Sequence, residues 1–337
     1  METRLIKPCD INVAGEIIKS GGVVAFPTET VYGLGANAFD ESAVKKIFEA
    51  KGRPSDNPLI VHICQKSQIK DLAEDITESA QKLIDAFMPG PFTIILKKKS
   101  TVPDIVSAGL SSVGIRLPMQ NTATEFIREA GVPIAAPSAN LSGKPSPTKA
   151  KHVIEDMWGR IDAIIDGEDC NVGVESTIVD ASGDVPCLLR PGGITFEELK
   201  AVVPKIKIDK NVLESVRADE RPKCPGMKYK HYSPKAEVIV IEGDKQAVQG
   251  KINELLRADA QKTIGILTMF GTVYDKGIMI DAGKSGKEYA KNLFDALRTF
   301  DELGVEKIYA EFCDVDGYGL AVKNRLYKAA GYNIIVV

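Results

Sequence analysis

Residues 51–63 have the sequence Lys51-Gly-Arg-Pro-Ser-Asp-Asn-Pro-Leu-Ile-Val-His-Ile63, and the rest of the chain is organised around this stretch. Two prolines enclose its Ser-Asp-Asn turn, and residues 59–63 are predicted to form a strand. A turn braced in this way can hold cationic and amide donors in fixed positions for an anion. The same residues are equally consistent with a solvated basic turn between a helix and a strand.

The composition is that of a globular protein with two domains. The chain has 337 residues, of which 44% are hydrophobic and 26% are charged. With 43 Lys and Arg against 46 Asp and Glu, the formal net charge is −3, which argues against tight non-specific binding of nucleic acid. A local basic pocket stays compatible with this charge.

The sequence contains neither a signal-peptide pattern at its N-terminus nor a run of about 18 apolar residues that could span a membrane. Its six cysteines lie far apart and form no Cys-x-x-Cys pair. This spacing favours reduced thiols over a disulfide framework or a zinc site. We therefore expect a cytoplasmic protein without membrane contact.

The first part of the chain alternates between strand and helix patterns. Helices are predicted over residues 11–20, 41–50, 77–87, 124–130 and 196–202, and strands over residues 23–26, 59–63, 92–96, 113–117, 133–136, 161–165, 176–179 and 187–189. Gly21-Gly22 is a plausible C-cap for the first helix, and Thr195 with Glu198 forms a capping-box pattern for the last. After the strand at residues 23–26, the glycines of Thr28-Glu-Thr-Val-Tyr-Gly-Leu-Gly35 are predicted to form a turn. That turn could bring backbone close to a ligand or could simply lead into a helix.

The second part of the chain has a different character. Residues from about 205 to 235 are densely charged and include the aromatic-basic run Met227-Lys-Tyr-Lys-His-Tyr232, which is typical of a linker that docks on another surface or of an exposed tether. From residue 237 onwards strands are predicted at 238–241, 263–269, 307–310 and 333–337, and helices at 248–258, 289–303 and 321–330. This alternation indicates a small parallel α/β domain.

Several common catalytic motifs are absent from the sequence. The segment from Gly277 to Gly283-Lys-Ser resembles a P-loop, but five residues separate its glycines where the motif needs four. Gly-x-Gly-x-x-Gly and Gly-x-Ser-x-Gly are both missing, and the wide spacing of the three histidines argues against a His-rich metal site.

What remains is a dispersed set of cations in Gly- and Pro-rich loops at strand ends, namely Lys51, Arg53, Arg116, Lys144 and Arg190. The loop at residues 137–148 adds several hydroxyls and Asn140, which suit phosphate and sugar oxygens. Cations and hydroxyls without a clear nucleophile favour a reaction that works by positioning and charge stabilisation. Transfer at a nucleotide phosphate is the natural candidate.

A set of motifs in this order resembles a known family. The motifs are Phe26-Pro-Thr-Glu-Thr-Val-Tyr-Gly-Leu-Gly35, Lys51-Gly-Arg-Pro-Ser-Asp-Asn-Pro-Leu59, Pro89-Gly-Pro-Phe-Thr93, Val113-Gly-Ile-Arg-Leu-Pro118, Ala136-Pro-Ser-Ala-Asn-Leu-Ser-Gly143, Glu175-Ser-Thr-Ile-Val-Asp180 and Leu189-Arg-Pro-Gly192. They are similar to the YrdC-type domain. The run Pro225-Gly-Met-Lys-Tyr-Lys-His-Tyr-Ser-Pro234 and the C-terminal run Gly319-Leu-Ala-Val-Lys-Asn-Arg-Leu326 resemble the two-domain form, the L-threonylcarbamoyladenylate synthase family.

The resemblance implies an α/β protein in three parts. Residues 1–205 would form a YrdC-like catalytic domain with a twisted mixed sheet and flanking helices. Residues 206–235 would form a linker that acts as a lid over the active site, and residues 236–337 a smaller Rossmann-like α/β domain.

The resemblance also implies a nucleotidyltransferase reaction. L-threonine, bicarbonate or CO2, and ATP would give threonylcarbamoyl-AMP and pyrophosphate. The product would serve the N6-threonylcarbamoylation of adenosine 37 in tRNAs that decode ANN codons, through downstream threonylcarbamoyl-transferase machinery and a weak contact with tRNA. Mg2+ is expected with ATP, held largely by phosphate oxygens and water.

Site residues are carried over by motif. The resemblance assigns L-threonine to Thr30, His62, Arg116, Ala136 and Ser176, and ATP to Lys51, Arg53, Asn57, Ser112, Ser138, Ser146, Arg190 and Tyr232. Lys51 and Arg53 are also its catalytic residues, and Ser111 is an alternative to Ser112. The stretch at residues 51–63 would then separate the two substrate pockets, with Lys51, Arg53 and Asn57 on the nucleotide side and His62 facing threonine.

Two other functions stay open at this point. An RNA-binding module could use a concave basic sheet, although the net charge and the lack of aromatic-basic strands count against it. A carbamoyl-transfer module acting on another protein would use carbamoyl phosphate, and its usual additional domains are missing from this sequence.

Overall fold

The structure is a computed structural model, and it describes residues 2–212, 224–225, 231–259, 261–313, 315 and 317–337. The chain divides into two units: Met1–Ser142 with Ser146–Lys228, and Gly143–Pro145 with Tyr229–Val337. The lid predicted at residues 206–235 falls largely on residues 213–223 and 226–230, which lie outside the described residues. The three-part division at residues 205 and 235 stays a prediction.

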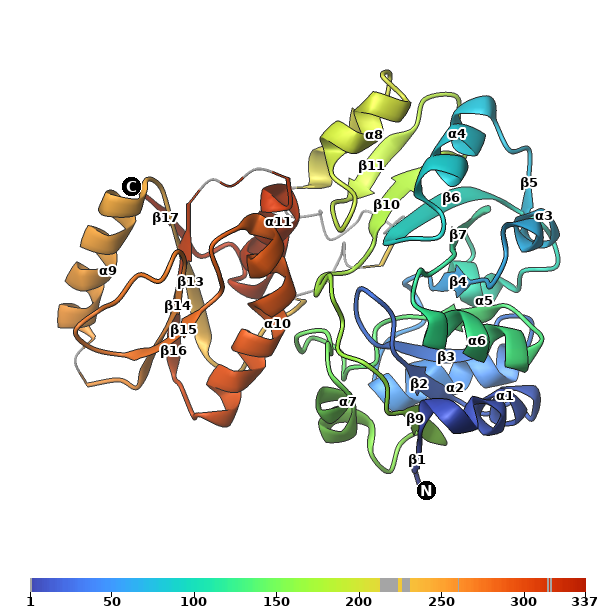
Figure 1. The fold of residues 1–337 in the computed structure, drawn as a ribbon, viewed down its shortest axis with the longest axis horizontal. Coiled ribbons are helices and arrows are strands. Elements are labelled where there is room, and N and C mark those ends of the chain that lie inside the picture. The colour runs from blue at the N-terminus through green and yellow to red at the C-terminus, as the bar shows by residue number, and fades with distance from the viewer. Residues whose placement is uncertain (1, 213–223, 226–230, 260, 314, 316) are drawn as a thin grey trace. The chain divides into compact units, whose positions relative to one another are not determined.

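Unit 1 is built on one twisted mixed sheet, which Figure 1 shows in blue to yellow-green. The strands run in the order β1-β9-β2-β3-β8-β4-β7-β6-β10-β11-β12, with β5 paired to β6. Their bounds are β1 Arg4–Ile6, β2 Val24–Phe26, β3 Gly33–Asn37, β4 Ile60–His62, β5 Ala73–Glu74, β6 Phe92–Lys98, β7 Ser112–Arg116, β8 Ile134–Ala136, β9 Ala163–Ile165, β10 Thr177–Asp180, β11 Cys187–Arg190 and β12 Lys207–Ile208. The predicted α/β class with a mixed sheet is confirmed, since β4 and β7 are parallel while β4 and β8 are antiparallel.

Helices flank this sheet (Figure 1). They are α1 Ile11–Lys19, α2 Glu41–Lys51, α3 Ile69–Leu72, α4 Glu78–Phe87, α5 Asp104–Ser107, α6 Asn121–Ala130, α7 Ala150–Met157 and α8 Phe196–Val202, with short 3-10 turns at Pro8–Asp10, Lys66–Gln68 and Lys210–Val212. The capping box predicted for α8 is confirmed. Thr195 Oγ1 accepts a hydrogen bond from Glu198 N at 3.2 Å, and the Glu198 carboxylate accepts one from Thr195 N at 2.7 Å.

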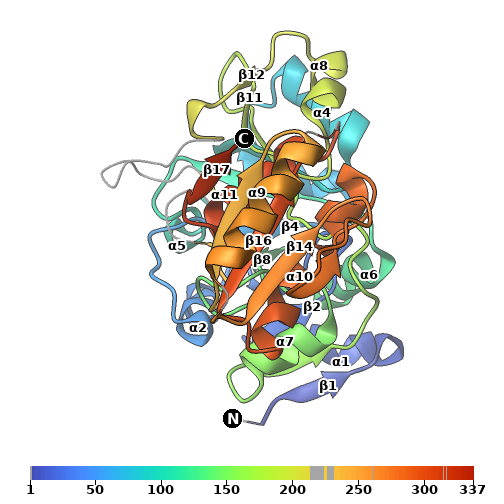
Figure 2. The ribbon, with the colours of Figure 1, turned by 90° about the vertical axis from the view of Figure 1, so that its left-hand side faces the viewer.

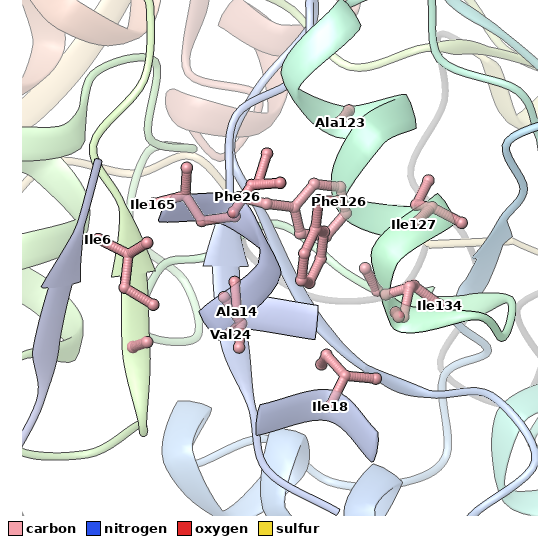
Figure 3. Packing of buried hydrophobic residues seen from close by; sticks show 14 residues of the cluster. Ile6, Ala14, Ile18, Val24, Phe26, Ala123, Phe126, Ile127, Ile134 and Ile165 are labelled. Carbon is pink, nitrogen blue, oxygen red and sulfur yellow. The ribbon is translucent and has the colours of Figure 1, made fainter. Parts of the chain in front are cut away.

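The core that supports the site lies where α1 and α6 cover β2 (Figure 3). Phe26 from β2 is fully buried there and contacts Phe126 of α6, with ring centroids 5.2 Å apart. The ring of Phe26 also meets His62 edge to face at 5.7 Å. This contact ties the histidine of β4 directly to the hydrophobic core.

The glycines after β2 do not form the predicted turn. Gly33 and Gly35 lie in a strand, β3, that pairs with β2 and β8. A Cβ at Gly33 would lie 2.9 Å from the Phe26 ring, and one at Gly35 would lie 2.6 Å from Ile134 Cγ2. The two glycines therefore make room for packing inside the sheet, and the interpretation as a ligand-approach turn is wrong.

Unit 2 is a parallel α/β unit of the Rossmann-like type predicted. Its strands are β13 Glu237–Glu242, β14 Ile264–Thr268, β15 Ile278–Asp281, β16 Lys307–Phe312 and β17 Ile334–Val336, in the order β15-β14-β16-β13-β17, and all described pairs are parallel. Helix α9, Lys245–Ala258, lies on one face of this sheet, and α10, Gly286–Glu302, and α11, Gly319–Ala329, lie on the other (Figures 1 and 2).

Unit 2 also contains a short piece of the polar loop, Gly143–Pro145. Ser233 N donates to Gly143 O at 3.0 Å, and Arg298 Nη2 donates to Pro145 O at 2.7 Å. The sequence did not predict this grouping, because the bonds join residues 90 and 153 positions apart. Among the described residues, no helix combines the length and the apolar character that a membrane crossing needs.

Candidate active site

Lys51 ends helix α2 and points away from solvent. Gly52 follows it with a φ of 59°, a left-handed conformation that stops the helix. The Lys51 side chain is only 3% exposed, and its Nζ donates to Ser138 O at 2.5 Å and to Asn140 O at 2.6 Å. Lys51 therefore fixes the backbone of the loop that follows β8, and with it the position of the Ser138 hydroxyl.

Asn57 is the most unusual polar residue of the site. It is fully buried, yet neither its amide nitrogen nor its amide oxygen has a hydrogen-bond partner among the residues that the structure describes. Leaving a buried polar group unpaired costs about 1–3 kcal/mol, so a native protein seldom keeps one without a use for it. Arg53 lies next to it, with Nη2 donating to Asn57 O at 3.4 Å.

His62 and Arg116 are neighbours across two parallel strands, since they form a registered pair between β4 and β7. Both side chains are buried. Arg116 Nη1 donates to Thr30 Oγ1 at 2.8 Å, and Arg116 Nη2 forms an ion pair with Glu29 Oε1 at 2.7 Å. The segment after β2 thus meets the end of β7 in a compact polar cluster.

His62 is neutral at physiological pH. Burial in the core, reinforced by the nearby charge of Arg116, lowers its pKa from 6.5 to about 3. Its Nδ1 lies 3.2 Å from Ile60 O, and the backbone of Ile134 also contacts the ring. His62 can therefore serve as a neutral hydrogen-bonding group but not as a cation.

Ser176, Arg190 and Ser146 form a second set of polar contacts, around the start of β10 and the end of β11. The hydroxyls of Ser176 and Thr93 lie 2.8 Å apart, so β10 is bonded to β6 at this point. Arg190 donates from Nε and Nη2 to Ser176 O, at 3.2 and 3.0 Å, and from Nη1 to Pro225 O at 3.2 Å. Ser146 Oγ donates to Glu175 Oε1 at 2.5 Å, one residue before Ser176.

A narrow apolar slot lies beside Ser112, with a free volume of about 10 Å3, enough for about one water molecule. Ile60, Ile178 and Pro225 contribute to its walls, and Ser112 contributes a hydroxyl. Gly114 also lines it, and a Cβ added there would lie 3.4 Å from Thr93 Cγ2 and 3.7 Å from Ile60 Cγ1. The absence of a side chain at Gly114 keeps this slot open. The alternative residue Ser111 is exposed and does not line the slot.

The structure brings most of the predicted residues of unit 1 into one region. Ala136 ends β8 and pairs with Ile60 of β4, so it lies in the same part of the sheet. Tyr232 belongs to unit 2, where its ring stacks on Phe294 with centroids 5.2 Å apart, and its assignment to ATP stays a prediction. Lys144 also belongs to unit 2.

Sequence reasoning missed three residues of this region: Glu29, Thr93 and Glu175. Each lies inside a quoted motif, next to or near a predicted residue, but its partner is distant in the chain. Glu29 is 87 positions from Arg116, Thr93 is 83 positions from Ser176, and Glu175 is 29 positions from Ser146. A charged residue in the middle of the motif at residues 26–35 was the available signal for Glu29. In the described part of the chain, no group of three or more His, Cys, Asp or Glu residues is arranged to hold a metal ion.

Comparison with known proteins places the chain in a defined family. A family model described as "Telomere recombination" matches residues 16–192, and a model described as "Threonylcarbamoyl-AMP synthase, C-terminal domain" matches residues 194–331. A threonylcarbamoyl-AMP synthase from Pyrococcus abyssi is 49% identical over 334 residues, covering 98% of this chain and 97% of the relative. Another from Bacillus subtilis is 49% identical over 327 residues, covering 96% and 93%. The crystal structure of P. abyssi Sua5 complexed with L-threonine superposes with a TM-score of 0.95 at 48% identity, covering all of both chains.

Proposed function

We propose, from the premise that the chain belongs to the threonylcarbamoyl-AMP synthase family of nucleotidyltransferases, that it joins L-threonine, bicarbonate or CO2, and ATP. The products are threonylcarbamoyl-AMP and pyrophosphate. The observation that carries this proposal is that the site has two separate polar regions. One is the buried cluster around Arg116, which donates to Thr30. The other contains the Asn57 amide, which has no partner among the described residues, and the Lys51 ammonium, which donates to Ser138 O.

The amino-acid side of the site is the cluster at the ends of β4 and β7. We assign L-threonine to Thr30, His62, Arg116, the backbone of Ala136, and Ser176. Arg116 suits a carboxylate because its guanidinium presents a planar fork of donors, and its Nε has no partner among the described residues. The neutral His62 suits a hydroxyl or an amine, because its Nε2 carries a lone pair when the proton is on Nδ1.

The nucleotide side lies towards the other end of β4. We assign ATP to Lys51, Arg53, Asn57, Ser112, Ser138, Ser146, Arg190 and Tyr232. The lining of the slot beside Ser112 fits this assignment, since it is apolar with a hydroxyl at its edge. With a free volume of about 10 Å3, the slot has to widen when the base enters. Its lining also favours Ser112 over Ser111.

The reaction then needs no protein nucleophile. The neutral threonine amine attacks CO2 and releases a proton to water, which gives a carbamate anion. A carbamate oxygen then attacks the α-phosphorus, and the bond between the α- and β-phosphates breaks to release pyrophosphate. Lys51 and Arg53 act by position and charge: Lys51 holds the Ser138 loop, and Arg53 lies beside Asn57. Mg2+ would supply charge neutralisation on the triphosphate, held by phosphate oxygens and water, because the described residues offer it no cluster of acidic ligands.

In the cell, the product would be used for N6-threonylcarbamoylation of adenosine 37 in ANN-decoding tRNAs. The partners proposed are the downstream threonylcarbamoyl-transferase machinery and, through a weak contact, tRNA itself. A cytoplasmic location fits this role. Residues 206–235 are proposed as the cover of the site and residues 236–337 as their anchor.

Mass spectrometry tests the proposal directly. Incubation with ATP, Mg2+, bicarbonate and L-threonine should yield threonylcarbamoyl-AMP and pyrophosphate, with L-serine as the control amino acid. Arg53→Ala should stay folded and lose threonine-dependent pyrophosphate release. Failure of the wild-type protein to form the adenylate under these conditions would rule out the proposed reaction.

A further inference from the structure

Glu29 is a buried carboxylate to which the assignments above give no role. Its side chain is 7% exposed and that of its partner Arg116 is 4% exposed. Oε1 accepts from Arg116 Nη2 at 2.7 Å, while the one contact of Oε2 with the described residues is a long one, 3.3 Å from Met119 N. One oxygen of this carboxylate is therefore firmly paired, and the other has capacity to accept further hydrogen bonds.

The pair is an expensive feature to keep in a protein interior. Removing two charges from water carries a large desolvation penalty, and well-packed apolar residues of the same volume are often as stable or more stable. Buried ion pairs are thus weak contributors to stability. This ion pair lies beside residues of the amino-acid site, because Arg116 donates to Thr30 and lies on the strand next to His62. Its retention there suggests that both charges also contact a bound ligand.

The proposed substrate carries a matching pair of charges. A free amino acid is a zwitterion, with an ammonium and a carboxylate on the same carbon. A site with one buried guanidinium alone would bind the carboxylate but leave the ammonium without its water and without a counter-charge. A neighbouring Arg and Glu in a neutral pair complement both groups, and the net charge of the pocket stays zero before and after binding.

Resting on the proposed function, we infer that Glu29 is the ammonium-binding residue of the amino-acid site, with Arg116 taking the carboxylate of the same molecule. Glu29 then selects an α-amino acid over a hydroxy acid of the same shape. It also places the nitrogen near the neutral His62. The ammonium then releases a proton to water before the free amine attacks CO2.

The competing explanation is that Glu29 only orients Arg116. The two roles differ in what they predict for a ligand without an amine. 3-Hydroxybutanoate keeps the carboxylate, the hydroxyl and the methyl of threonine and replaces the ammonium with hydrogen. If Glu29 only orients Arg116, loss of its charge weakens both ligands by the same factor. If Glu29 binds the ammonium, the loss weakens threonine alone.

The experiment is calorimetric titration of the full chain with L-threonine and with 3-hydroxybutanoate. The proteins are the wild type, Glu29→Gln, and the matched control Glu197→Gln, which makes the same change at an exposed position on α8. ATP affinity is measured on each protein as a check on the rest of the site.

We expect the wild type and Glu197→Gln to prefer threonine by about tenfold to a hundredfold, the range of one charge-assisted contact. In Glu29→Gln the ratio of the two affinities, threonine over 3-hydroxybutanoate, should fall towards one. The affinity for 3-hydroxybutanoate should stay the same or rise, because the Glu29 carboxylate no longer competes with that of the ligand for Arg116. Equal weakening of both ligands would overturn the inference.

The wild-type measurement keeps the test decisive if Glu29→Gln does not fold. A wild type that binds 3-hydroxybutanoate as tightly as threonine has no ammonium-binding residue, and this result also overturns the inference while leaving the proposed reaction standing. A wild type that binds neither ligand, with ATP present or absent, refutes the proposed function itself.

Discussion

Replacing Gly114 with alanine separates nucleotide binding from folding. A Cβ at this position would lie 3.4 Å from Thr93 Cγ2, 3.7 Å from Ile60 Cγ1 and 3.8 Å from Ile95 Cγ1, all ordinary van der Waals distances. The strand conformation of β7 also suits alanine. The change should therefore leave the unfolding free energy unchanged or raise it by about 0.4–1 kcal/mol, because the unfolded chain loses conformational freedom.

Gly114 lines the narrow slot beside Ser112, so the same methyl group would take space that the slot must open for the base. One methylene too many in an apolar pocket changes binding by about 1–3 kcal/mol, which corresponds to a 10- to 200-fold change in affinity. We expect Gly114→Ala to weaken ATP binding within this range and to leave threonine binding unchanged, because His62 and Arg116 keep their contacts.

Thermal unfolding and titration calorimetry with ATP and with threonine make the comparison. Gly250→Ala is the matched control, since Gly250 lies in α9 of unit 2 and a Cβ there meets nothing within 4 Å. An unchanged ATP affinity in a folded Gly114→Ala protein would show that the slot does not take the nucleotide. A large loss of stability would refute the packing argument.

Three further variants test other parts of the site. Asn57→Ala should weaken ATP binding about tenfold and change the unfolding free energy by less than about 1 kcal/mol, because the amide has no hydrogen bond to lose within the described part of the chain; a large fall in stability with normal ATP affinity would contradict this. Lys51→Met should destabilise the protein by about 1.5–3 kcal/mol and weaken ATP binding, since it removes a charged donor from Ser138 O and Asn140 O; Lys45→Met, an exposed position on the same helix, should do neither. For His62 the folded pKa of about 3 lies below the unfolded value of 6.5, so only the unfolded chain takes up the proton between these values. The unfolding free energy should therefore fall by about 1.4 kcal/mol per pH unit below pH 6.5, roughly 2 kcal/mol by pH 5. Urea titrations at pH 7 and 5 measure this fall, and His62→Gln should reduce it by that amount.

Regular elements with strong local signals were predictable from the sequence. The α8 capping box and the alternation of unit 2 depend on residues a few positions apart, and the structure has these elements where the pattern placed them. The edge strand β15 is an addition that the pattern did not predict. The three-residue strand β1 was not predicted, because its pairing partner β9 lies about 160 residues away and a short segment carries little periodicity of its own. Helix α7 was missed for a similar reason, since it is short and directly follows a loop rich in Pro and Ser.

The residues of the candidate site also differ in whether nearby or distant parts of the chain determine their contacts. The motif residues His62 and Arg116 could be named from the sequence, but the partner of Arg116 could not. Glu29 lies 87 positions from Arg116, and only the folding of β2 and β7 into one sheet brings the two together. Likewise, Gly33-Leu-Gly35 has the composition of a ligand-binding loop. In the structure, glycine is needed at both positions because a Cβ there would lie too close to the Phe26 ring on the neighbouring strand.

The contact between His62 and Phe26 has a consequence for the thermodynamics of ligand binding. A side chain that must be ordered when a ligand arrives typically forfeits about 0.5–1.5 kcal/mol of binding free energy. The His62 ring is already immobilised against Phe26, which is itself wedged against Phe126. The hydrophobic core of unit 1 thus orders His62 before the ligand binds. A substitution that leaves a cavity at Phe126, such as Phe126→Ala, should therefore make the entropy of threonine binding less favourable.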